Sequence, residues 1–153
     1  MLKYTNFDIV FSEIPEEVTL AINISNCPNR CKGCHSPYLQ EDIGFELTNK
    51  VLKDIVDKYK NSITCICFMG GDASPDEVCS SAVLIKETYN NKIKTAWYSG
   101  KNKLENDNYT KYFNYLKLGS YNEEKGPLNK PTTNQRLYKI VNNKMIDITK
   151  ELQ

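Results

Sequence analysis

The ligand chemistry of this chain is concentrated in one short stretch, SNCPNRCKGCHSPY, at residues 25–38. It holds three cysteines within eight residues, Cys27, Cys31 and Cys34, and His35 follows the last of them directly. Thiolates bind zinc and iron–sulfur clusters. A structural zinc ion takes four protein ligands, and a four-iron, four-sulfur cluster normally takes four thiolates. Three cysteines therefore leave one ligand to be explained.

Two interpretations of the missing ligand are open. In the first, a fourth ligand comes from His35, Cys65, Cys67 or Cys79. In the second, one metal position stays open so that a substrate or cosubstrate can bind there. Cys65 and Cys67 alternate within the apolar run ITCICFM, and Cys79 falls in an expected helix, so all three are predicted to be small buried side chains.

A second motif, GGD, follows the same apolar run. Gly70 and Gly71 allow backbone to approach a ligand closely, and the Asp72 carboxylate is an acceptor suited to an ammonium group. Most GGD segments are simply turns, but this one directly follows the next expected strand, which favours a role in ligand binding.

Apolar, β-branched segments predict strands near residues 6–11, 18–24, 63–69, 93–98 and 115–118, and a terminal hairpin over 136–148. Helical patterns cover residues 48–61, 75–89 and roughly 101–114. Thr48 is expected to cap the first of these helices, and Ser74 followed by Pro75 is expected to begin the second. Strands alternating with helices predict an α/β fold with a mostly parallel sheet and a C-terminal hairpin. In such a sheet the cysteine loop, GGD and the Ser99–Gly100 turn all follow strands, so they are expected on one rim.

The length, net charge and hydropathy of the chain argue against several classes of protein. The chain has 153 residues and a net charge of +1, which predicts one domain over residues 1–153 and no general affinity for nucleic acid. No apolar run approaches the length of a membrane span, and the N-terminus does not read as a signal peptide. A cytoplasmic, reducing location is therefore expected, where clustered cysteines more often bind metal than form disulfides.

These motifs together resemble the radical S-adenosylmethionine (SAM) superfamily. Cys-x3-Cys-x2-Cys follows the first buried strand, and a Gly-Gly-acid motif follows the second. Three segments resemble the glycyl-radical activases within that superfamily: CPNRCKGCHSP at 27–37, GGDASPDEV at 70–78 and PTTNQRLYKI at 131–140. The resemblance spans about residues 6–141. Asp72 stands where glutamate is commoner in the superfamily.

The resemblance implies a specific activity. Cys27, Cys31 and Cys34 would each bind one iron of a [4Fe-4S] cluster, and SAM would bind the fourth iron. Reductive cleavage of SAM would yield a radical that takes a hydrogen atom from a glycine of anaerobic ribonucleoside-triphosphate reductase. The electron would come from a flavodoxin or a ferredoxin. The fold implied is an open partial (β/α) barrel, because the chain is too short for a complete one.

The resemblance also assigns residues to SAM. Gly70, Gly71 and Asp72 would hold its amine, and the backbone from Gly33 through Cys34 to His35 would approach its adenine side.

Other interpretations remain open at this stage. The chain could activate a different glycyl-radical enzyme, or it could be a zinc-binding interaction module that uses Cys27, Cys31, Cys34 and His35.

Five further residues have no settled role in the sequence. Trp97 or Tyr98 would flank the adenosine while the other lies in the core, since neighbouring strand residues face opposite ways. Asn134 and Gln135 have no assigned role, and Arg136 would meet the partner backbone, the SAM carboxylate, or neither.

Overall fold

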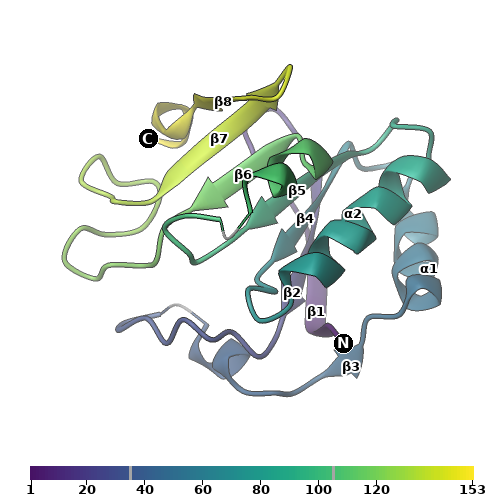
Figure 1. Ribbon diagram of the computed structural model, residues 1–153, viewed down its shortest axis with the longest axis horizontal. Helices are drawn as coiled ribbons and strands as arrows, with labels where there is room; N and C mark the ends of the chain where they lie inside the picture. The colour runs from purple at the N-terminus through teal and green to yellow at the C-terminus, as the bar shows by residue number, and fades with distance from the viewer. Residues whose placement is uncertain (35, 105) are drawn as a thin grey trace.

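The computed structural model describes residues 1–34, 36–104 and 106–153. The chain forms one eight-stranded sheet in the order β3-β1-β2-β4-β5-β6-β7-β8 (Figure 1). The strands are β1 (Lys3–Val10), β2 (Thr19–Ile24), β3 (Phe45–Glu46), β4 (Cys65–Met69), β5 (Lys94–Tyr98), β6 (Tyr115–Leu118), β7 (Arg136–Val141) and β8 (Lys144–Asp147). The helices are α1 (Asn49–Tyr59) and α2 (Pro75–Thr88), with short 3-10 helices η1 (Pro37–Gln40), η2 (Asp107–Tyr112) and η3 (Thr149–Leu152).

The predicted mostly parallel, open partial (β/α) barrel is wrong. Only the pairs β2–β4, β4–β5 and β5–β6 are parallel, whereas β1–β2, β1–β3, β6–β7 and β7–β8 are antiparallel. The sheet is therefore mixed and more often antiparallel than parallel, and it ends at the two edge strands β3 and β8. The physical reason lies in the connections: a parallel pair needs a crossover, and the flanking strands are joined by loops that let the chain turn back.

The predicted C-terminal hairpin is confirmed. β7 and β8 pair antiparallel with Val141 opposite Lys144. The two residues between them, Asn142 and Asn143, both have left-handed backbone, with φ of 51° and 63°. Asparagine tolerates this conformation, which a two-residue hairpin turn requires at both positions.

One face of the sheet is covered by α1 and α2 (Figure 1). Their apolar side chains pack on alternate residues of the central strands, among them Ile22, Phe68 and Trp97. The Thr48 side chain caps α1 as expected, because its hydroxyl accepts a hydrogen bond of 3.1 Å from the Val51 amide.

Two local expectations near α2 were wrong. The Ser74 side chain makes no capping hydrogen bond to α2, although Pro75 does begin the helix. The expected helix over 101–114 is reduced to η2. Asn106 accepts a hydrogen bond from the Asn108 amide, and such local bonds from asparagine compete with helix propagation.

The opposite face carries the residues that matter for the site. A row of four side chains crosses the parallel strands in register: Asn23 of β2, Met69 of β4, Tyr98 of β5 and Lys117 of β6. Loops and η3 cover this face through apolar residues, namely Ile14, Leu128, Ile148 and Leu152. The prediction that Cys65 and Cys67 are buried on one face is confirmed, since both are fully buried on this side.

Glu17 lies at the amino ends of the parallel strands. Its buried carboxylate accepts hydrogen bonds from the Thr64 hydroxyl at 2.7 Å, the Lys94 ammonium at 2.7 Å and the Tyr115 hydroxyl at 2.6 Å. Burial favours the neutral acid, but these three donors outweigh it, so the pKa of Glu17 falls below its ordinary value of 4.5. One carboxylate thus ties the β1–β2 loop to the amino ends of β5 and β6.

We therefore expect acid to weaken the metal-free protein through Glu17. A lowered folded-state pKa stabilises the fold above the unfolded-state pKa, and this contribution is lost as the pH falls below about 4.5. Glu17→Gln should lower the free energy of unfolding at pH 7 by about 1.5–3 kcal/mol. In this variant the free energy of unfolding should also fall less steeply as the pH is lowered. Urea unfolding of both proteins between pH 3 and 7 measures this, and parallel pH profiles would contradict it.

Candidate functional site

The three clustered cysteines line one cavity. It has a volume of about 270 Å³ and lies at the carboxyl ends of the parallel strands. Its lining includes the cross-strand row of Asn23, Met69, Tyr98 and Lys117, together with Cys27, Cys31 and Cys34 from the loop after β2, and Tyr121, Pro127 and Gln135 from the loop after β6. The expectation that the segments following the strands meet at one rim therefore holds, although the sheet is mixed.

The backbone of the cysteine loop (residues 25–34) bends through left-handed residues. Asn26, Arg30 and Gly33 have φ of 60°, 51° and 73°. A Cβ atom at Gly33 would lie 3.0 Å from the side chain of Glu123, so a larger residue there would push that side chain aside and would strain the left-handed backbone. This conformation leaves all three thiols half-buried against the cavity.

The donor set of the loop fits an iron–sulfur cluster. All six cysteines are free, and two of the loop sulfurs already accept hydrogen bonds: the Asn29 amide lies 3.4 Å from Cys27 Sγ, and the Ser36 backbone amide lies 3.4 Å from Cys34 Sγ. Such bonds stabilise cluster thiolates and tune the reduction potential. The described residues contain no group of three His, Cys, Asp or Glu side chains placed to bind a single metal ion.

A fourth cysteine does not join the three. Within the described chain, Cys65 and Cys67 are buried in β4 and do not line the cavity. Burial raises the pKa of Cys65 to about 12, so it remains a neutral thiol. His35, the remaining candidate for a fourth ligand and for an adenine contact, lies outside the described residues.

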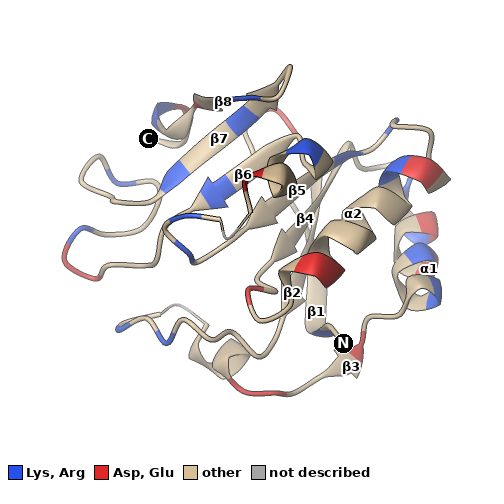
Figure 2. Ribbon diagram, in the orientation of Figure 1, with Lys and Arg blue, Asp and Glu red and all other residues tan. Residues whose placement is uncertain are grey.

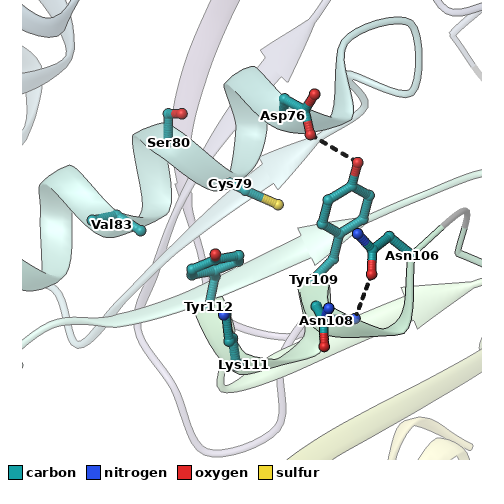
Figure 3. Close-up of a pocket in the computed structure, with 9 residues that line it drawn as sticks. All are labelled: Asp76, Cys79, Ser80, Val83, Asn106, Asn108, Tyr109, Lys111 and Tyr112. Carbon is teal, nitrogen blue, oxygen red and sulfur yellow. Dashed lines mark hydrogen bonds between the residues drawn. The ribbon is translucent and has the colours of Figure 1, made fainter.

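Cys79 belongs to a different cavity, of about 470 Å³, between α2 and η2 (Figure 3). Burial also raises the pKa of Cys79 to about 12. In this second cavity the Tyr109 hydroxyl donates a hydrogen bond of 2.8 Å to Asp76, which joins η2 to the first turn of α2. These side chains stabilise the packing of the two helices.

The glycines of GGD allow close packing at the end of β4. Gly70 and Gly71 have φ of 114° and 92°, and an added Cβ would lie 2.9 Å from the Ile24 carbonyl oxygen or 2.5 Å from Val78 Cγ2, respectively. The Gly70 carbonyl accepts a hydrogen bond of 2.7 Å from the Trp97 indole. Gly70 lines the cysteine cavity, whereas Gly71 is buried and is not among the described lining residues.

Asp72 is the junction of the site. One carboxylate oxygen accepts a hydrogen bond of 2.5 Å from the Ser99 hydroxyl. The other accepts bonds from the Asn29 amide at 2.6 Å and the Gly100 backbone amide at 2.8 Å. A carboxylate has about four lone-pair sites, so three donors leave about one for a ligand. Asp72 thus joins the cysteine loop, the end of β4 and the turn after β5.

Lys117 is the buried cation of the cavity. Its ammonium donates a hydrogen bond of 3.0 Å to the Gly119 carbonyl and lies 5.7 Å from the centre of the Tyr98 ring. Burial lowers the pKa of Lys117, while Asp72 and the loop cysteines Cys31 and Cys27 oppose that shift. Figure 2 shows Lys and Arg positions in blue on β6 and on the loop after β2.

The C-terminal motif divides between two places. Gln135 is buried in the cysteine cavity, and its side chain donates a hydrogen bond of 3.3 Å to the Gly119 carbonyl. Asn134 donates to the Ser120 carbonyl at 3.1 Å. Arg136 instead approaches Asp147 at 3.8 Å across the β7–β8 hairpin. Only Gln135 of the three therefore contributes to the cavity lining that the structure describes.

The adjacent aromatics also separate, as strand alternation predicts. Trp97 is buried among the residues that contact the helices, and Tyr98 lines the cavity.

Sequence analysis missed Asn29 and Lys117. The sequence did carry a signal for Lys117, because it is the one charged residue in the apolar strand segment YLKL. Alternate residues of a strand face the same side of the sheet, and in the observed register Lys117 lies opposite Tyr98. Asn29 carried no such signal, because its partner Asp72 lies 43 residues further along the chain.

The comparisons agree with this donor chemistry. The model of the 4Fe-4S single cluster domain family matches residues 16–141, and the chain belongs to that family. It is therefore an iron–sulfur protein. No curated protein and no solved structure gave a significant match. Among the described residues, no helix has the length and apolar character needed to cross a membrane.

Substitution of the loop cysteines tests the ligand set. Cys27→Ala, Cys31→Ala and Cys34→Ala should each lose most of the iron and sulfide bound after anaerobic reconstitution, because each removes one of three thiolates. Cys79→Ala is the matched control, since Cys79 lines the other cavity. Iron and acid-labile sulfide analysis measures the result. Full iron content in any loop variant would remove that cysteine from the ligand set.

Proposed function

We propose that the protein is a radical SAM activase that reductively cleaves SAM and generates a glycyl radical on anaerobic ribonucleoside-triphosphate reductase. The observation that supports this proposal is the makeup of the cavity. Three thiols from one loop line it, no fourth cysteine lies in its described lining, and Asp72 and Lys117 supply one carboxylate and one ammonium beside them. An iron–sulfur cluster with one iron free of protein ligands is suited to binding a small zwitterionic cosubstrate.

When bound by Cys27, Cys31 and Cys34, the cluster supplies the one electron that cleaves the sulfonium of SAM. The protein supplies position and charge. A flavodoxin or ferredoxin is the expected source of that electron.

The charged groups of the cavity complement SAM. The amine of SAM is the fourth donor that Asp72 can accept, next to Asn29, Ser99 and Gly100. The ammonium of Lys117 attracts its carboxylate. In this proposal Gly70 and Gly71 shape the amine side.

The adenine side of SAM would face the end of the cysteine loop. The proposal places the backbone of Gly33, Cys34 and His35 there.

The glycine of the reductase needs its own access. Tyr98, Lys117, Pro127 and Gln135 also line an adjacent space of about 540 Å³, whose other lining residues include Glu13 and Leu128. Two cavities that share these four residues would allow a backbone loop of the partner to approach SAM through a space that no cysteine lines. We assign the glycine loop to this second space.

Hydrogen transfer tests the proposed reaction. The reductase would be prepared with deuterated glycine and mixed anaerobically with the reconstituted protein, SAM and dithionite. Deuterium should appear in 5′-deoxyadenosine, as measured by mass spectrometry, and a glycyl radical should appear on the reductase. SAM cleavage without deuterium transfer would point to a different glycyl-radical enzyme as the partner, and absence of cleavage would overturn the activase.

The role assigned to Lys117 gives a separate prediction. Lys117→Met should weaken SAM binding by about ten- to a hundredfold, the effect of losing a charge-assisted hydrogen bond of about 1.5–3 kcal/mol. The fold should survive, because an apolar side chain of similar length replaces a buried charge. Lys139→Met, on an exposed position of β7, is the control. Equilibrium dialysis with labelled SAM measures both, and equal affinities would remove Lys117 from the site.

A further inference from the structure

The Asn29 side chain bridges two parts of the site. Its amide nitrogen lies 2.6 Å from Asp72 Oδ2 and 3.4 Å from Cys27 Sγ. A primary amide carries two N–H groups, so it can donate to both acceptors at once. Asn29 therefore connects an anchored carboxylate to one of the three cysteines.

Gly100 makes room for this bridge. A Cβ atom at position 100 would lie 2.4 Å from the Asn29 amide nitrogen and 3.4 Å from Asp72 Oδ2. The amide could not keep its place against such an atom. The backbone of Gly100 is not in the left-handed region, so an alanine there would displace Asn29 without straining the chain itself.

At the start of the loop Ser25 donates hydrogen bonds to the Lys3 carbonyl of β1, and apart from the Asn29 bridge the other hydrogen bonds described for the loop stay within the segment between β2 and β3. Cys27 is held by the Leu39 carbonyl, and Arg30 donates to Gln40, both of which belong to the same excursion between β2 and β3. Among the hydrogen bonds described for residues 27–34, the bond from Asn29 to Asp72 is the one that joins the loop to the ends of β4 and β5.

We propose that Asn29 is a positioning residue, whose amide ties the Cys27 sulfur to Asp72 and so fixes the cysteine loop against the sheet. It acts through Cys27 and touches no reacting atom. Its second N–H also offsets part of the thiolate charge, which makes a bound cluster easier to reduce. This second effect rests on the cluster of the proposed function, whereas the fixing of the loop does not.

Hydrogen exchange of the metal-free, full-length chain tests the positioning. Asn29→Ala and Gly100→Ala remove the same bridge from its two sides. Both should raise the exchange rate of amides in residues 27–34 severalfold. Asn102→Ala is the matched control, because it removes a hydrogen bond that the side chain of this nearby residue accepts from the Ser120 amide, and it does not touch the bridge. Mass spectrometry of peptides from this loop measures the rates, and wild-type exchange in both test variants would overturn the proposal.

The reduction potential tests the bond to sulfur. After reconstitution, Asn29→Ala should have a lower midpoint potential than the wild type, and Asn102→Ala should not differ from it. An unchanged potential in Asn29→Ala would overturn the bond to Cys27. If the wild-type chain takes up no cluster, the proposed function fails, and the exchange experiment still decides whether Asn29 positions the loop.

Discussion

The register of four parallel strands determines where chemistry can occur in this protein. Parallel neighbours need crossover connections, and the crossovers through α1 and α2 lie on one face of the sheet. The opposite face is left to loops, and the row from Asn23 to Lys117 becomes the base of a cavity. Glu17 holds the amino ends of these strands in place. A slip of one residue in any of these pairs would turn the row toward the helices.

Charge is balanced across that cavity. A cluster bound by three thiolates brings negative charge into a half-buried space, and Lys117 is a buried cation already present there. Asp72 would add to the negative charge, but three donors from two separate segments satisfy it. In the proposed function, the Asp72 carboxylate would pair with the amine of a zwitterion and the Lys117 ammonium would pair with its carboxylate, so that neither charge would be left unpaired.

The sequence predicted which residues share the cavity better than it predicted the fold. The spacing of Cys27, Cys31 and Cys34 and the position of Asp72 after a strand indicated ligand chemistry, and all four line one cavity, while their binding roles stay predictions. The central strands were found because buried parallel strands are continuously apolar. The order of the sheet was not found, since strand direction depends on which way each loop turns back and not on the strand sequence. The bridge from Asn29 to Asp72 was missed for a related reason, because contacts between distant segments arise only after folding.

The open iron is the feature on which the proposed activity depends, and electron paramagnetic resonance observes it most directly. The reconstituted protein would be reduced with dithionite under anaerobic conditions and measured with and without SAM. We expect a reduced-cluster signal whose shape changes when SAM is added, because SAM would bind the iron that lacks a cysteine. A cluster signal that is identical in both samples would contradict the proposed function, although the chain would still be an iron–sulfur protein.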